Sequence, residues 1–317
     1  MPRPRILFMG TPAFALPALE QLCTRIYPVI GVVTQPDRPR GRGQKEIAAP
    51  VKILAQKLGL PVYQPEKVKD PQFLKIFYEL NPEMVVVAAY GQILPREIID
   101  FPPLKCLNIH PSLLPRYRGA APINWAIIRG ETKTGVTIMK MDEGMDSGDI
   151  ILQQETPIDA DEDFGRLHDR LAVQGASLLI EAIDQVAAGT AAFQKQDAAA
   201  VTFAPRLQKE DGRINWNSGA EDIVNLIRGL SPAPAAYTYL SGQQLKIFAA
   251  ACEKGGAKGA AGKIGAKTNN GLPVAAADGY VVLKEIQLAG KKRMPVSDFL
   301  RGFHLIPTRF WAEKENT

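Results

Sequence analysis

The chain has 317 residues, of which 46% are hydrophobic and 22% are charged, a balance typical of a soluble globular protein with room for two domains. No unbroken apolar run approaches the roughly 18 residues of a membrane span, and the start carries no secretory cleavage pattern, so we expect a cytoplasmic protein. Its three cysteines and three histidines are too scattered for a disulfide framework or a zinc site, which predicts a site without a metal.

The net charge of +5 is unevenly distributed along the chain. Residues 1–205 hold 22 Lys and Arg against 23 Asp and Glu, whereas residues 206–317 hold 16 against 10. A basic final third is compatible with an acidic partner such as nucleic acid, and also with a merely solvated basic surface.

The first part of the chain alternates short apolar runs with amphipathic segments. The apolar runs predict buried strands, and several amphipathic segments begin with proline, which is favoured in the first turn of a helix. The expected strands include 5–9, 29–34, 84–89 and 135–141, and the expected helices include 50–58, 71–80, 122–130 and 163–188. This alternation indicates an α/β fold with a doubly wound, mostly parallel sheet, whose ligands lie outside the carboxyl ends of the strands.

Two nucleotide-binding motifs are missing from the sequence. The turn Gly10–Ala13 lacks the second and third glycines of GxGxxG, and no GxxxxGK[ST] phosphate loop occurs. We therefore expect neither NAD nor ATP as a cofactor.

An amide and an imidazole stand two residues apart where one apolar run ends. Asn108 and His110 are followed by Pro111, which ends regular strand pairing. Because residues i and i+2 of a strand point to the same face, the two side chains converge on one volume above the sheet edge. A structural histidine beside a turn asparagine is the alternative that this pair alone leaves open.

An acidic loop follows the predicted strand 135–141. Residues 142–149 hold four acids and two glycines, but they lack the spacing of an EF-hand, so calcium is not expected. Asp146 in this loop could lie beside His110 and fix the tautomer of its ring.

These polar groups lack the nucleophile of a hydrolytic triad, since Ser112 is near in sequence but no GxSxG surrounds it. An amide donor and a protonated imidazole stabilise an oxyanion, and an Asp–His pair can exchange a proton. The set suits direct transfer of an acyl group to an incoming amine.

A basic loop lies between the second predicted strand and its helix. Residues 35–45 contain four cations and one acid, with Arg38, Arg40 and Arg42 at alternate positions. Planar guanidinium groups in this arrangement can contact phosphates or bases. A solvated loop without a ligand is the other interpretation, although loops at this end of the sheet surround the active site.

The periodicity of the chain fades at residues 196–213, where we place a linker between a domain 1–195 and a domain 214–317. In the second domain one helix at 220–228 precedes short strand-like runs with glycine-rich turns, which predicts a small β-barrel with the OB fold as candidate. The expected strands are 236–240, 244–250, 262–266, 273–276 and 280–288.

Several stretches together carry a resemblance that covers almost the whole chain. They are FMGTP at 8–12, QPD at 35–37 with GRG at 41–43, NIHPSLLPRYRGAAP at 108–122, and DEGMDSGD at 142–149. On these motifs the chain resembles the methionyl-tRNA formyltransferase family. The resemblance implies a Rossmann-like formyltransferase domain and an OB-like tRNA-binding domain. It also implies transfer of the formyl group of 10-formyltetrahydrofolate to the α-amino group of methionyl initiator tRNA.

The resemblance implies roles for individual residues on the same motifs. The catalytic set is Asn108, His110 and Asp146. The folate-binding set lies on three loops and comprises Tyr90, Gly91, Gln92, Ile93, Leu94, Ser112, Leu113, Leu114, Pro115, Asp142, Glu143 and Gly144. The set that binds the tRNA comprises Arg38, Arg40, Arg42, Lys45 and Lys209. A monomer that does not bind a membrane is expected.

Two positions depart from the family pattern: Ser147 stands where threonine is expected, and Gln44 precedes Lys45 where two basic residues are common. One alternative is a formyltransferase or hydrolase that acts on a sugar nucleotide or on water. The basic loop and the basic second domain favour tRNA as the substrate over this alternative. The other is a nonenzymatic RNA-binding protein on a degenerate folate fold, against which the intact polar set argues.

Overall fold

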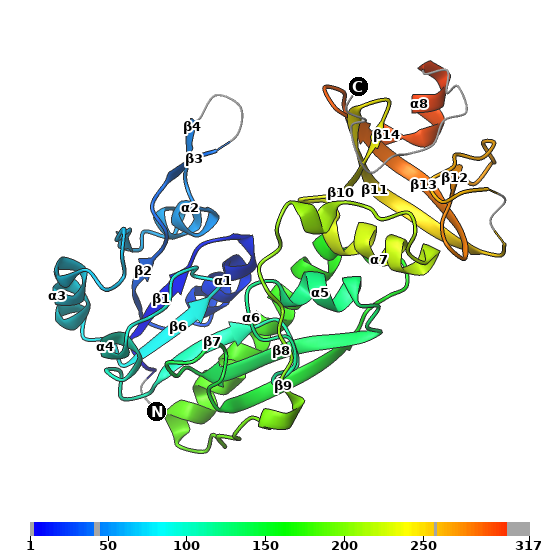
Figure 1. Cartoon of the computed structure of the whole chain (residues 1–317). Helices are drawn as coiled ribbons and strands as arrows, with labels where there is room; N and C mark the ends of the chain where they lie inside the picture. Colours follow the sequence, from blue (N-terminus) through cyan, green and yellow to red (C-terminus); the bar gives the residue numbers. More distant parts are fainter. Residues whose placement is uncertain (1–2, 41–44, 257–258, 303–317) are drawn as a thin grey trace. The chain divides into compact units, whose positions relative to one another are not determined.

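The computed structural model describes residues 3–40, 45–256 and 259–302, with only the backbone described at 39, 40, 45 and 46 (Figure 1). The chain divides into two compact units. The first holds the residues up to Pro122, Thr134–Thr156 and His168–Ala204, and the second holds Ile123–Lys133, Pro157–Leu167 and the residues from Pro205 onward. Two segments that precede residue 195 therefore group with the C-terminal residues.

The first unit is built on a seven-stranded sheet with the order β5-β2-β1-β6-β7-β8-β9. Its strands are β1 (Ile6–Gly10), β2 (Val29–Val33), β5 (Val62–Tyr63), β6 (Met84–Ala88), β7 (Cys106–His110), β8 (Lys133–Lys140) and β9 (Ile150–Pro157). The pairings from β5 to β7 are parallel, and β8 runs antiparallel to β7. The predicted mostly parallel sheet is thereby confirmed, with β9 as a strand that the sequence did not indicate.

Helices connect these strands as the positions of proline predict. They are α1 (Leu16–Thr24), which follows the 3-10 turn η1 (Ala13–Ala15), then α2 (Pro50–Lys57), α3 (Pro71–Leu80), α4 (Arg96–Ile99), α5 (Pro122–Ile128) and α6 (Phe164–Ala188). Proline stands in the first turn of α1, α2 and α3. Asp70 caps α3 by accepting a hydrogen bond from Gln72 N at 2.8 Å, which satisfies one of the unpaired N–H groups at the helix start.

Strand β7 turns its apolar side chains toward helix α6. A Cβ atom added to Gly175 of α6 would lie 2.7 Å from Cγ2 of Ile109, so only glycine allows the helix to approach this closely. Because side chains alternate along a strand, Asn108 and His110 point to the opposite face. The packing of Ile109 thus sets the direction of both polar side chains.

By length and composition, α6 could cross a membrane, although its sequence contains no unbroken apolar run of that length. Half of its most apolar window is buried inside the protein, and the core helix of a soluble protein meets the same criterion. Leu171, Leu179 and Ile183 on this helix are fully buried.

The expected loop at 35–45 is in part a β-hairpin, which corrects that prediction. Strand β3 (Arg38–Arg40) pairs antiparallel with β4 (Lys45–Ile47), so that Pro39 lies opposite Glu46. The alternation that separates the arginines also suits a short strand. Arg42 lies outside the described residues.

The second unit contains a five-stranded antiparallel sheet with the order β10-β11-β13-β12 and with β14 paired to β13. Its elements are α7 (Ala220–Leu230), β10 (Ala236–Leu240), β11 (Gln243–Lys254), β12 (Leu272–Ala275), β13 (Gly279–Leu288), β14 (Met294–Pro295) and α8 (Val296–Gly302). Ile223 and Ile227 of α7 share one core with Leu245 and Leu283 of the sheet. The β-rich second domain is thus confirmed as an antiparallel sheet. The strand expected at 262–266 is wrong, because this range forms only an isolated bridge, at Lys263 and Ile264, to the neighbourhood of β12.

Candidate active site

Asn108 and His110 lie on β7, an inner strand between β6 and β8, close to its carboxyl end. Asn108 is opposite Val87 of the parallel strand β6 and opposite Met139 of β8, and His110 is opposite Thr137. The two polar side chains are only 9% and 4% exposed. A buried polar side chain costs free energy unless it is hydrogen-bonded, so their partners decide what they can do.

The imidazole of His110 is held from both sides. Its Nε2 lies 3.0 Å from the carbonyl oxygen of Tyr117, and its Nδ1 lies 3.6 Å from Oδ1 of Asp146. A carbonyl oxygen can only accept, so Nε2 carries the proton of that bond. Nε2 is thus hydrogen-bonded, while Nδ1 faces a carboxylate oxygen at ion-pair distance.

Asp146 reaches His110 from a backbone conformation that few residues adopt. Its φ angle is +49°, in the left-handed region that Asp tolerates better than most residues. The other carboxylate oxygen, Oδ2, accepts a hydrogen bond from Gly119 N at 2.8 Å. One carboxylate therefore connects the loop after β7 with the imidazole.

In the part of the chain that the structure describes, no partner hydrogen-bonds to the side chain of Asn108. Its amide can therefore still donate to a ligand that lies on this face of the sheet.

The segment Ser112–Pro115 is fixed by two side chains from neighbouring strands. Thr137 Oγ1 donates to Ser112 O at 2.7 Å and accepts from Leu114 N at 3.1 Å. Gln153 Nε2 from β9 donates to Leu114 O at 2.8 Å. The contact of Gln153 could not be predicted from the sequence, because β9 was not predicted. The backbone of this segment is consequently preorganised beside Asn108 and His110.

The residues predicted after β6 divide between core and surface. Tyr90 is buried, which raises the pKa of its hydroxyl, and that hydroxyl has no partner among the described residues. Leu94 lies in the core, and the amide of Gln92 accepts from Val68 N at 2.8 Å. Ile93, in contrast, is 90% exposed, and Gly91 is exposed as well. In the segment Tyr90–Leu94, a ligand can therefore reach the backbone and the side chain of Ile93.

The predicted acidic residues are held mainly by contacts within their own loop. The carboxylate of Asp142 accepts from Ser147 Oγ at 2.8 Å and from Gly144 N at 3.1 Å. Glu143 forms an ion pair with Arg96 of α4 at 2.9 Å, with both side chains more than half exposed. An exposed pair of this kind contributes at most about 1 kcal/mol.

The predicted tRNA-binding residues are described only in part. Arg38 is exposed on β3, and Lys209 is exposed before the 3-10 turn η3 (Glu210–Gly212) of the second unit. The side chains of Arg40 and Lys45 lie outside the description, as does the whole of Arg42.

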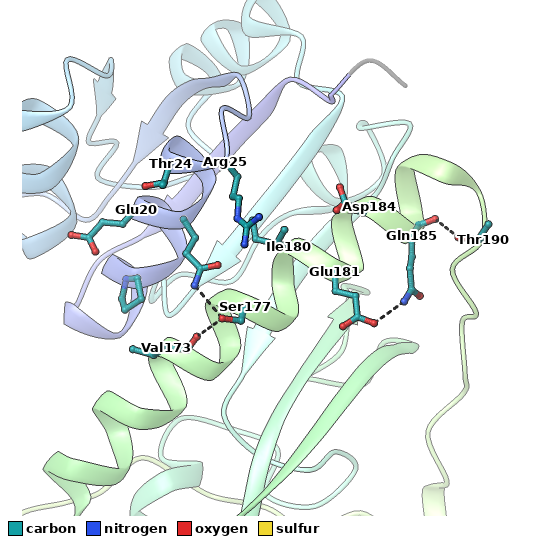
Figure 2. Close-up of a pocket in the computed structure, with 12 residues that line it drawn as sticks. Glu20, Thr24, Arg25, Val173, Ser177, Ile180, Glu181, Asp184, Gln185 and Thr190 are labelled. Carbon is teal, nitrogen blue, oxygen red and sulfur yellow. Dashed lines mark hydrogen bonds between the residues drawn. The ribbon is translucent and has the colours of Figure 1, made fainter.

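The first unit also has a cavity of about 900 Å³ between α1 and α6, shown in Figure 2. Gln21 and Ser177 connect the two helices there through a hydrogen bond of 3.1 Å. None of the predicted site residues lines this cavity. It is therefore separate from the polar set on β7.

A mostly parallel sheet with an amide and an imidazole near the end of its inner strand β7, and a carboxylate beside the imidazole, defines an α/β enzyme suited to group transfer. The chain belongs to the formyl transferase family. The family model "Formyl transferase" matches residues 4–183, and "Formyl transferase, C-terminal domain" matches residues 206–304.

Relatives extend over nearly the whole chain. The methionyl-tRNA formyltransferase of Syntrophus aciditrophicus (strain SB) is 57% identical over 95% of this chain and 96% of its own. That of Geotalea uraniireducens (strain Rf4) is 48% identical over 98% and 99%. A solved sugar 3N-formyl transferase, WlaRD, shares the fold with a TM-score of 0.65 at 20% identity over 91% of this chain and 98% of its own.

Proposed function

We propose that the protein transfers the formyl group of 10-formyltetrahydrofolate to the α-amino group of methionyl initiator tRNA. The product is N-formylmethionyl-tRNA, which serves translation initiation in the cytoplasm, and the enzyme acts as a monomer that does not bind a membrane. The names and near-complete coverage of the relatives support the reaction. The observation that carries the proposal is the His110 ring, fixed between Tyr117 O and Asp146 beside the amide of Asn108, which has no hydrogen-bond partner among the described residues.

In the proposed reaction, the neutral α-amine attacks the formyl carbon. A new C–N bond forms, the bond from the formyl carbon to N10 of the folate breaks, and the proton lost by the amine balances the one gained by N10. Asn108 donates to the formyl oxygen while it carries negative charge, and a positively charged His110 ring stabilises the same charge electrostatically; one preorganised donor is worth about 3 kcal/mol in the transition state. Asp146 orients the imidazole and takes part in the proton transfer.

The folate cosubstrate supplies the formyl group, and the residues around the polar set fit it. The fixed backbone of Ser112–Pro115 offers hydrogen-bonding groups at constant positions, and Ile93 offers an exposed apolar side chain for a flat ring. We assign the folate to Tyr90–Leu94, Ser112–Pro115 and Asp142–Gly144.

For the tRNA we assign Arg38, Arg40, Arg42, Lys45 and Lys209. The hairpin β3–β4 carries Arg38, Arg40 and Lys45 on two short paired strands, which suits contacts with phosphates, and Arg42 lies outside the described residues. Arg42→Ala should weaken the use of methionyl-tRNA while folate binding stays unchanged. An unchanged kcat/KM for initiator tRNA would contradict this role.

The catalytic assignment is tested by single-turnover formylation of methionyl initiator tRNA. We expect Asn108→Ala, His110→Ala and Asp146→Ala each to lower the rate by about 100-fold or more, since each removes a group that acts in the transition state. Circular dichroism and thermal melts show whether each variant is folded. Rates near that of the wild type in folded variants would refute the assignment.

The substrate is tested separately with the wild-type protein. We expect transfer to methionyl initiator tRNA and rejection of uncharged and elongator tRNA. Formyl transfer to an amino-sugar nucleotide, without transfer to tRNA, would favour the alternative function that shares this fold.

A further inference from the structure

The segment after α6 contacts the site instead of leaving the first unit. Residues 194–204, here called the strap, were expected to enter the linker at residue 196, but they belong to the first unit. At one end Gln194 and Ile150 exchange backbone hydrogen bonds of 2.8 and 2.9 Å. At the other end Arg118 N donates to Thr202 O at 2.9 Å. The strap thus joins the start of β9 to the loop that follows β7.

One side chain of the strap bridges the same two regions. Gln196 Oε1 accepts from Nε and Nη2 of Arg118 at 3.0 and 2.7 Å, and its Nε2 donates to the carbonyl oxygens of Asp146 and Gly148, both at 2.8 Å. A guanidinium can only donate and a carbonyl can only accept, so the amide has one possible orientation. All four hydrogen-bonding positions of this amide are occupied.

The acidic loop needs such support where Gln196 contacts it. The φ of +49° at Asp146 is an unfavourable conformation that persists only when the surroundings impose it. The loop also passes close to β8, since a Cβ on Gly148 would lie 1.8 Å from Lys140 O. Gln196 binds the peptide oxygens on both sides of this turn, two residues apart, while Gly119 N holds the carboxylate itself.

We propose that Gln196 is a positioning residue, which keeps the Asp146 carboxylate beside His110 by hydrogen bonds to the carbonyl oxygens of Asp146 and Gly148. Arg118 orients the amide for this task from the other side. The proposal rests on the proposed roles of Asp146 and His110 in formyl transfer. It assigns a purpose to a polar side chain that lies 50 residues away in sequence from the carboxylate that it positions.

The test begins with Gln196→Met, which keeps the length of the side chain and removes every hydrogen bond. We expect kcat to fall about tenfold, while KM for methionyl-tRNA stays within about twofold, because two bonds to the acidic loop are lost and no tRNA contact is changed. Gln196→Glu can still accept from Arg118 but cannot donate to the two carbonyl groups. We expect the same fall in kcat for this variant.

Gln185→Met is the matched control, because Gln185 is also half-buried and Glu181, on the surface of α6, is the one partner of its side-chain amide among the described residues. Its kcat should equal that of the wild type. In a background of Asp146→Ala, Gln196→Met should change kcat by less than twofold, whereas a purely structural role would again lower it tenfold.

A wild-type kcat in either folded Gln196 variant, or a full second loss in the Asp146→Ala background, would overturn the proposal. The wild-type assay comes first, so failure of the proposed function is seen independently. If the wild type does not formylate methionyl-tRNA, a crystal structure of Gln196→Met still tests the positioning role of Gln196. A separation of Asp146 from His110 equal to that in the wild type would overturn the positioning role.

Discussion

Tyr27 is a residue whose titration differs between the folded and unfolded chain. Its hydroxyl is buried and donates to Asp184 of α6, and burial together with this bond raises the pKa of Tyr27 to about 12. An unperturbed tyrosine has a pKa near 10. The folded chain therefore holds this proton more tightly than the unfolded chain does. The resulting stabilisation is complete below about pH 10 and is lost as the pH rises toward 12.

Tyr27→Phe should remove this part of the alkaline sensitivity. We expect the free energy of unfolding of the variant to fall less than that of the wild type between about pH 10 and pH 12, because phenylalanine has no proton to lose. Urea unfolding at a series of pH values measures the difference. Parallel curves for the two proteins would show that Tyr27 does not titrate with folding.

At the scale of single residues, the sequence predicts where Asn108 and His110 lie better than it predicts the contacts around them. The period of two along a strand is enough to place Asn108 and His110 on one face, and that placement is what the structure has. The contacts of His110 with Tyr117 O and of Asp146 with Gly119 N depend on how two loops fold back. No local pattern encodes such contacts, since backbone atoms supply one partner in each.

At the scale of elements, Thr137 of β8 determines the geometry of the loop after β7. It is fully buried, and its hydroxyl bonds to both Ser112 O and Leu114 N. Thr137→Val keeps the shape and leaves both backbone groups without this partner. Because an unsatisfied buried group costs about 1–3 kcal/mol, we expect the free energy of unfolding to fall by about 2 kcal/mol and folate binding to weaken about tenfold.

Thr137→Ser is the control for this prediction, because it keeps the hydroxyl and loses only a methyl group. Denaturant unfolding and a folate titration compare the three proteins. If Ser and Val variants bind folate equally well, the hydroxyl does not position the loop.

Elements with a clear period were predicted almost to the residue, and elements without one were missed. Helix α3 has the expected bounds, since proline starts it and Asn81 ends it at a φ of +45°. Strand β9 was missed because Gln153, Gln154 and Glu155 interrupt its apolar pattern at the edge of the sheet. Edge strands carry polar residues, so their sequences resemble loops.

At the scale of the whole molecule, the amino-acid composition predicts that there are two units, but it does not predict their boundaries. The change from long helices to short strands and glycine-rich turns predicts a second, β-rich unit, as observed. The segments Ile123–Lys133 and Pro157–Leu167, which group with that unit, come from the part of the chain with α/β character. A prediction from the sequence assumes that each domain is one continuous stretch, so it could not assign these two segments to the second unit.

The uneven charge of the chain predicts how the proposed tRNA interaction depends on salt. Five cations are assigned to the tRNA, and residues 206–317 carry an excess of six positive charges. If five cations contact phosphates, the logarithm of the affinity should fall with the logarithm of the salt concentration at a slope of about −4.

Arg38→Ala, at an exposed position on β3, should reduce this slope by about 1 and leave the KM for folate unchanged. Lys75→Ala is the control, because Lys75 is likewise an exposed cation, lies on α3 and pairs with Glu79 as its one partner among the described residues. Equilibrium binding of methionyl-tRNA between about 50 and 200 mM salt measures the slopes. A slope near zero for the wild type, or an equal change for both variants, would refute a specific contribution of the hairpin to tRNA binding.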